Sequence, residues 1–147
     1  MASSSRPRDR GQALVEFSLT LIVFLVLIMA IVDLGRGIYM YNGVSQSVRE
    51  IARVTSVHPG TTLGNSAETA AVVATQKRLI PNLGTPTFSC VDVDDTPVSG
   101  PCPSGMRVKV TIVAPYRAVT PLLGLAGTFN LSSASSVEIP FNLLQTP

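Results

Sequence analysis

The sequence predicts an α+β protein with a long N-terminal transmembrane helix, a second, shorter helix and a three-stranded antiparallel sheet. Three patterns support this fold class. Residues 17–32 form an uncharged, mostly apolar run, residues 66–80 are rich in alanine, and apolar and polar residues alternate in the C-terminal part. These patterns divide the chain into a basic leader at residues 1–11, a helix at residues 12–57 and a small domain at residues 58–147.

The apolar run is long enough to cross a membrane. Together with residues 13–15 it is about twenty residues long, and at ~1.5 Å per residue it spans a hydrocarbon core of ~30 Å. Arg6, Arg8 and Arg10 lie just before it. The positive-inside rule therefore predicts a single-pass membrane protein whose N-terminus is cytoplasmic and whose C-terminal domain is extracytoplasmic.

A cleaved secretory signal is the competing interpretation of the N-terminus, and it predicts a soluble mature protein that begins near Asp33. The apolar run is longer than the ~7–15 residues of a typical signal core. The residues after Ala30 are Ile31 and Val32, so the small-residue pattern of a signal cleavage site is missing. Both observations favour the membrane anchor.

The helix is expected to continue beyond the membrane. Apolar residues recur at intervals of three and four after Gly37, which is the spacing of one helical face: Ile38, Tyr41, Val44, Val48 and Ile51. A helix from Gln12 to Val57 would be ~70 Å long at ~1.5 Å per residue. A break near Gly35, which would give two shorter helices, is the alternative.

Glu16 lies just inside the apolar run, where a carboxylate is costly unless it is paired or reaches water. The basic leader, Gly11 and the pair Glu16-Phe17 together resemble the cleavage motif of type IV prepilins. In that family the leader is cut after the glycine, so the resemblance implies cleavage between Gly11 and Gln12. Gln12 departs from the pattern, because type IV pilins usually carry an apolar residue there. The alternative for Glu16 is a solvated carboxylate at headgroup depth.

The longer segment from Arg10 to Arg53 resembles the TadE-like proteins of tight-adherence pilus systems, which are small pilin-like proteins with one helix and a modest extracytoplasmic domain. The resemblance implies a pseudopilin or minor pilin, that is, a structural or assembly component of a type IV-like pilus. It implies a prepilin peptidase, other pilin-like subunits and an inner-membrane assembly platform as partners, besides membrane lipid. Glu16 and Phe17 would take part in subunit pairing.

The alanine-rich segment predicts a second helix from Ser66 to Ile80, which stops before Pro81. Asn65 and Glu68 have the spacing of a capping pair at its start. The small side chains of this segment suit close packing against the first helix or the sheet.

Three strands are predicted from the two-residue period, at residues 87–93, 106–114 and 129–139. The segment from Cys90 to Cys102 would form a hairpin loop between the first two strands, and residues 121–127 form an apolar connection before the third. Two cysteines in an oxidising compartment favour a disulfide, which would contribute ~3 kcal/mol by the loop-closure model. Two free buried thiols are the alternative.

No catalytic site can be assembled from the sequence, so we expect neither an enzyme nor a cofactor. The single histidine, His58, has no neighbours at metal-ligand spacing. Asp92, Asp94 and Asp95 form an acidic cluster that fits a solvated hairpin tip better than a calcium site. The formal net charge of +2 is too small to suggest nucleic acid. A membrane-anchored binding module unrelated to filaments, with an uncut Gly11, is the alternative function.

Overall fold

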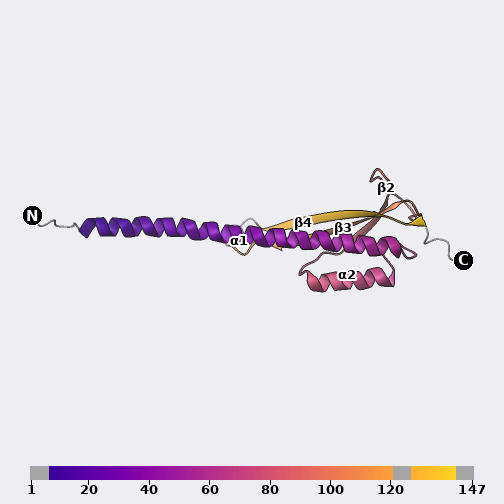
Figure 1. The fold of residues 1–147 in the computed structure, drawn as a ribbon, viewed down its shortest axis with the longest axis horizontal. Helices are drawn as coiled ribbons and strands as arrows, with labels where there is room; N and C mark the ends of the chain where they lie inside the picture. The colour runs from indigo at the N-terminus through magenta and orange to yellow at the C-terminus, as the bar shows by residue number, and fades with distance from the viewer. Residues whose placement is uncertain (1–6, 121–126, 142–147) are drawn as a thin grey trace, which may run out of the picture.

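The computed structural model describes residues 7–120 and 127–141 of the 147-residue chain. Figure 1 shows a long helical rod whose C-terminal half lies along a sheet, while its N-terminal half extends away from the rest of the molecule. The fold is therefore α+β, as predicted. The elements in chain order are α1 (Pro7–Val57), α2 (Ala67–Leu79), β1 (Thr87–Val91), β2 (Pro97–Val98), β3 (Arg107–Arg117) and β4 (Thr128–Glu138).

α1 is one continuous helix of 51 residues. The alternative break near Gly35 does not occur, because one glycine costs a helix only ~1 kcal/mol relative to alanine. The helix begins at Pro7 rather than at Gln12, so its first turn lies within the predicted leader. Proline suits the first helical position, since its missing N–H is one that would have no partner there.

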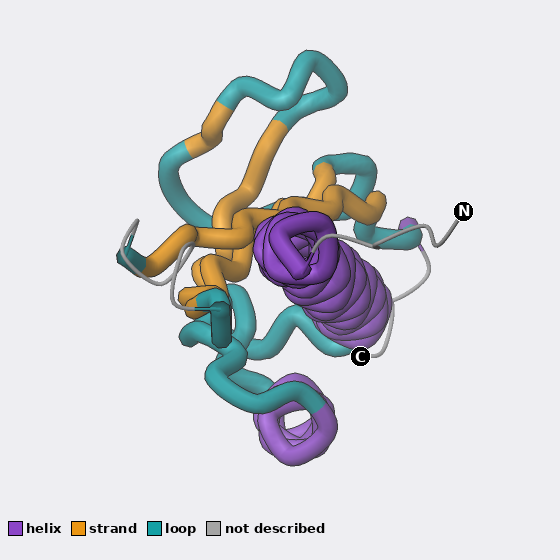
Figure 2. The backbone as a smooth tube through the Cα atoms, turned by 90° about the vertical axis from the view of Figure 1, so that its left-hand side faces the viewer, coloured by secondary structure: helices purple, strands orange, loops and turns teal. Residues whose placement is uncertain are grey.

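α2 runs alongside the C-terminal half of α1 (Figure 1). Its N-cap is Ser66 and not Asn65, because the Ser66 hydroxyl accepts a hydrogen bond from the Thr69 N–H at 3.1 Å. The C-terminal end of α2 comes close to α1 at Gly43, where an added β-carbon would lie 3.2 Å from the side chain of Ile80, the residue that caps α2. Figure 2 shows the strands on one side of α1 and α2 on another.

The antiparallel sheet has four strands, in the order β2-β1-β3-β4, rather than the three predicted. The extra strand, β2, lies inside the predicted hairpin loop, where Val98 pairs with Cys90. A tight turn produces it: the Asp95 N–H donates to the Asp92 carbonyl, and Asp95 adopts a positive φ of 61°. The same turn ends β1 at Val91, two residues earlier than expected.

β3 is longer than predicted, because it continues through Pro115 to Arg117. β1 pairs with β3 only as far as Thr111, so the remainder of β3 has a partner on one side only. Proline is tolerated at such an edge. The predicted apolar connection between β3 and β4 lies, at residues 121–126, outside the described residues.

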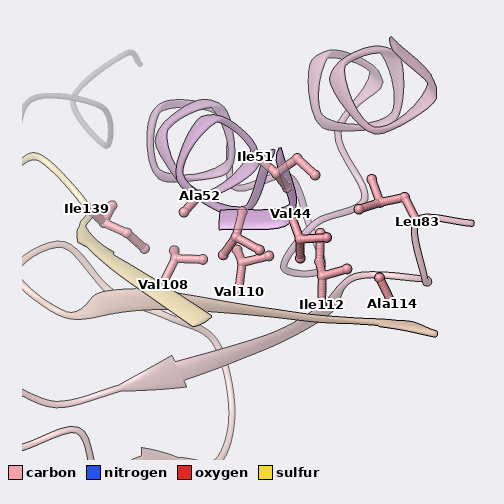
Figure 3. Packing of buried hydrophobic residues seen from close by; sticks show 10 residues of the cluster. Val44, Ile51, Ala52, Leu83, Val108, Val110, Ile112, Ala114 and Ile139 are labelled. Carbon is pink, nitrogen blue, oxygen red and sulfur yellow. The ribbon is translucent and has the colours of Figure 1, made fainter. Parts of the chain in front are cut away.

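The core lies between α1 and the sheet (Figure 3). The predicted apolar face of α1 supplies Val44, Val48 and Ile51, all fully buried. Alternate residues of β3 point toward them, and full burial of each such side chain contributes ~1.5–3 kcal/mol. The residues of this cluster are Val44, Val48, Ile51, Ala52, Leu83, Val108, Val110, Ile112, Ala114 and Ile139.

Candidate functional site

The N-terminal half of α1 has an apolar surface that nothing in the described structure covers. Leu14, Phe17 and Ile22 are each about 60% exposed, at 66%, 63% and 59%. α1 is long and apolar enough to cross a membrane, and its most apolar window contains no buried residue. Such a surface requires lipid or other helices around it. One N-terminal apolar helix of this kind fits a single-pass membrane protein.

The polar hydroxyls within the apolar run are satisfied by the helix itself. The Ser18 hydroxyl donates to the Leu14 carbonyl at 2.7 Å, and the Thr20 hydroxyl donates to the Glu16 carbonyl at 2.9 Å. Because these bonds return to the preceding turn, neither hydroxyl needs a partner from outside. The run is therefore compatible with a hydrocarbon environment despite its two polar residues.

The four predicted processing and pairing residues lie together near the start of α1, on consecutive turns. Gly11, Gln12, Glu16 and Phe17 are all helical and exposed. Gln12 and Glu16 are four positions apart, so they share one face of the helix. Across residues 11–120 and 127–141, the Glu16 carboxylate forms no ion pair. It lies on the same open surface as the apolar side chains around it.

A second polar site, which sequence reasoning missed, lies where α1 leaves the apolar run. Asp33 is only 3% exposed, and its carboxylate accepts hydrogen bonds from the Val119 N–H at 3.1 Å and the Thr120 N–H at 2.9 Å. The Thr120 hydroxyl also donates to this carboxylate. The Tyr116 hydroxyl donates to the Asp33 carbonyl at 2.8 Å. These bonds fasten residues 116–120 to α1.

Asp33 and Arg36 also form an ion pair, but this contact is weaker than the hydrogen bonds from residues 119 and 120. The closest N···O distance is 3.9 Å, and the Arg36 side chain is 53% exposed. Hydrogen bonds from the Thr120 side chain and backbone hold the pKa of the Asp33 carboxyl below its usual value. Val119 and Arg36 lower this pKa by smaller amounts. Asp33 is therefore an ionised anchor for the sheet.

Apolar hollows flank the Asp33 anchor on both sides. One lies next to the apolar run and is lined by Ile28, Met29, Val32, Val119 and Thr120, together with Asp33 and Arg36. The other lies between α1 and the ends of β3 and β4, and its lining includes Leu34, Ile38, Tyr41, Tyr116, Phe129 and Leu131. The junction between α1 and the sheet is thus apolar around one buried carboxylate.

The predicted cysteine pair lies at the opposite end of the sheet. A disulfide joins Cys90 in β1 to Cys102 in the segment before β3, with 5.5 Å between the Cα atoms. The bond encloses the short strand β2. It closes the β1–β2 hairpin against the start of β3.

Two of the three acidic side chains in this hairpin, those of Asp92 and Asp95, contact other groups of the protein. The Asp95 carboxylate lies 3.3 Å from the Lys109 amine and 4.0 Å from the Arg107 guanidinium. Asp92 accepts a hydrogen bond from the Val93 N–H at 2.6 Å. Within the described residues, no three His, Cys, Asp or Glu side chains are grouped so that they could hold a metal ion.

Comparison with known proteins finds a similarity in the N-terminal part of the chain. A family model described as TadE-like protein matches residues 11–53, which confirms the resemblance predicted for this segment. The matched segment contains Gly11, Glu16 and Asp33, and it also contains the α1 residues that pack in the core, Val44, Val48, Ile51 and Ala52. No curated protein and no solved structure matches the chain.

Proposed function

We propose that this chain, whose residues 11–53 match the TadE-like family, is a non-catalytic structural or assembly component of a tight-adherence, type IV-like pilus. The uncovered apolar half of α1, continuous with a helix packed in a folded domain, carries the proposal. In the membrane this half is the anchor. In an assembly it is the surface along which helices of other pilin-like subunits pack.

The proposal includes processing by a prepilin peptidase at the cytoplasmic end of α1. Gly11 is exposed, and no described side chain lies within 4 Å of the place where its β-carbon would be. Removal of residues 1–11 would leave Gln12 as the N-terminal residue, one helical turn from Glu16. The shortened protein would then engage other subunits and an inner-membrane assembly platform, with the sheet domain outside.

The N-terminal sequence of the mature protein tests the proposal. When the chain is co-expressed with an active prepilin peptidase, mass spectrometry should show the loss of residues 1–11, and a peptidase with its active site removed should leave them in place. Residues 1–11 retained with the active peptidase would contradict processing and favour a membrane-anchored binding module. A mature protein that begins near Asp33 would instead identify a secreted domain.

A further inference from the structure

We propose that the sheet makes a second contact with the membrane, through the junction loop, which we define as residues 118–120. This inference rests on the membrane-spanning role of α1 in the proposed function. The loop leaves β3 at the end nearest the apolar run. Val119 within it is 69% exposed, and it lines the same hollow as Met29 and Val32 of the run.

The depth of the junction loop is fixed by Asp33. The N–H groups of Val119 and Thr120 both donate to the Asp33 carboxylate, and Asp33 directly follows Val32, the last residue of the run. Met29 lies about one helical turn, or ~6 Å, deeper in the membrane than Asp33. When the run occupies the hydrocarbon core, the Val119 side chain therefore lies at its outer boundary.

The residues around the junction loop are those that favour a membrane interface. Arg36 is exposed on α1, and Arg117 is exposed immediately before the loop. Arginines in such positions attract anionic lipid headgroups. All three tyrosines of the chain lie nearby, Tyr39 and Tyr41 within three turns of Asp33 on α1 and Tyr116 hydrogen-bonded to the Asp33 carbonyl. Tyrosine is enriched where membrane meets water.

Continuity with the apolar run identifies lipid, rather than a protein, as the occupant. Ile28 and Met29 face lipid whenever a single copy of α1 spans the bilayer, and Val119 extends the surface that they form. A subunit covering the loop would have to displace lipid from this same surface.

The test uses the full-length protein, one copy per nanodisc, in phosphatidylcholine with phosphatidylglycerol. The chain has only the two cysteines of the disulfide, so one added cysteine accepts an environment-sensitive fluorophore. The probe position is Val119→Cys. Val93→Cys is the matched control, because Val93 is a valine of almost equal exposure, 68%, at the opposite end of the sheet. Leu21→Cys reports on the span itself.

Lipids carrying a quencher near the headgroup should quench the probe at position 119 several-fold more than the probe at position 93. Equal quenching at these two positions, with strong quenching at position 21 by a deeply placed quencher, would overturn the junction-loop contact and leave the membrane span intact. Absence of quenching at position 21 would instead contradict the anchoring role in the proposed function. A probe at position 119 shielded from aqueous iodide but not quenched by lipid would show that protein covers the loop, which also overturns the proposal.

Discussion

The Asp33 carboxylate accepts hydrogen bonds from both the backbone N–H and the side-chain hydroxyl of Thr120, a residue 87 positions further along the chain. Together with the bond from Tyr116 to the Asp33 carbonyl, this contact fixes the end of β3 against α1 where the apolar run ends. Because α1 is continuous through this point, the contact also sets the direction in which the uncovered N-terminal half of α1 leaves the domain.

Replacement of Asp33 by asparagine should loosen the junction without unfolding the domain. The amide side chain could accept through one oxygen only and would lack the charge that strengthens these bonds. We expect amide hydrogen exchange at Val119 and Thr120 to become about tenfold faster or more, with the core amides of β3 little changed. Glu50→Gln is the matched control, because it breaks an exposed pair with Arg53 on the same helix. Unchanged exchange in Asp33→Asn would show that the contact is not stabilising.

The same contact predicts a pH dependence. The pKa of Asp33 is lowered in the folded protein by the hydrogen bonds from Thr120, so the unfolded state binds the proton more readily. The stabilisation is therefore fully present above the unfolded pKa of ~3.9 and is lost as the pH falls through the lower folded pKa. In detergent micelles, the difference in unfolding free energy between wild type and Asp33→Asn should be constant near neutral pH. It should shrink below about pH 4, and a difference that grew on acidification would contradict this assignment.

Elements with a strong local period could be predicted from the sequence. Val44, Val48 and Ile51 repeat at four and three residues, and this spacing alone identifies the face of α1 that is buried. The alternation in β3 similarly identifies Val108, Val110 and Ile112 as core residues. In both cases the pattern indicates which side of the helix or strand faces the core. That face can therefore be predicted without knowing which segment packs against it.

Features that depend on contacts between distant segments could not be predicted in this way. The Asp33–Thr120 contact has no local signature, because Asp33 stands out only as the charged residue that ends the apolar run, and nothing beside it indicates Thr120 as its partner. The strand β2 is only two residues long and exists because a turn at Asp92–Asp95 returns the chain to β1. The start of α1 at Pro7 is not evident from the sequence, because proline breaks a helix at interior positions and is favourable only in its first turn.

Gly84 should be intolerant of a side chain. A β-carbon added there would collide with the Val113 carbonyl oxygen, which is backbone and cannot move without distorting β3. We expect Gly84→Ala to lower the free energy of unfolding by about 2–3 kcal/mol, the range of a serious overpacking error. Gly35→Ala is the control, because nothing described lies within 4 Å of its added carbon and alanine favours a helix by up to ~1 kcal/mol. Equal stability of the two variants would contradict the close approach of Gly84 to the Val113 carbonyl.

Reduction of the disulfide should destabilise the sheet end that carries β2. Cys90 and Cys102 are 12 positions apart, and a bond across a loop of this size contributes about 3 kcal/mol by restricting the unfolded chain. Non-reducing peptide mapping should recover the linked peptides, and a reducing agent should lower the unfolding midpoint. The double variant Cys90→Ala, Cys102→Ala should show no response to the reductant. Two alkylatable thiols in the unreduced native protein would end the prediction.

Glu16 should affect association between subunits rather than insertion of α1 into the membrane. If Gly11 is removed, the new α-amino group of Gln12 has a pKa of ~7.7–8.0 and is mostly cationic near neutral pH. It can pair with a Glu16 carboxylate of the same or an adjacent subunit. Two opposite charges ~4 Å apart attract by ~4 kcal/mol at an effective dielectric of ~20, comparable to the ~2.5–3.5 kcal/mol cost of a buried charge in a membrane helix.

Pairing between neighbouring helices would fix their axial register. Loss of the Glu16 charge should therefore weaken association even where the shape of the side chain is kept. We expect Glu16→Gln and Glu16→Ala to insert normally but to give markedly less crosslinking and co-purification with other pilin-like subunits. Ser18→Ala is the matched control, because the Ser18 hydroxyl donates to the Leu14 carbonyl of its own helix and its replacement leaves the Glu16 charge in place. If both Glu16 variants associate as well as wild type, Glu16 is a solvated carboxylate at the membrane edge, and the register must be set by the apolar side chains alone.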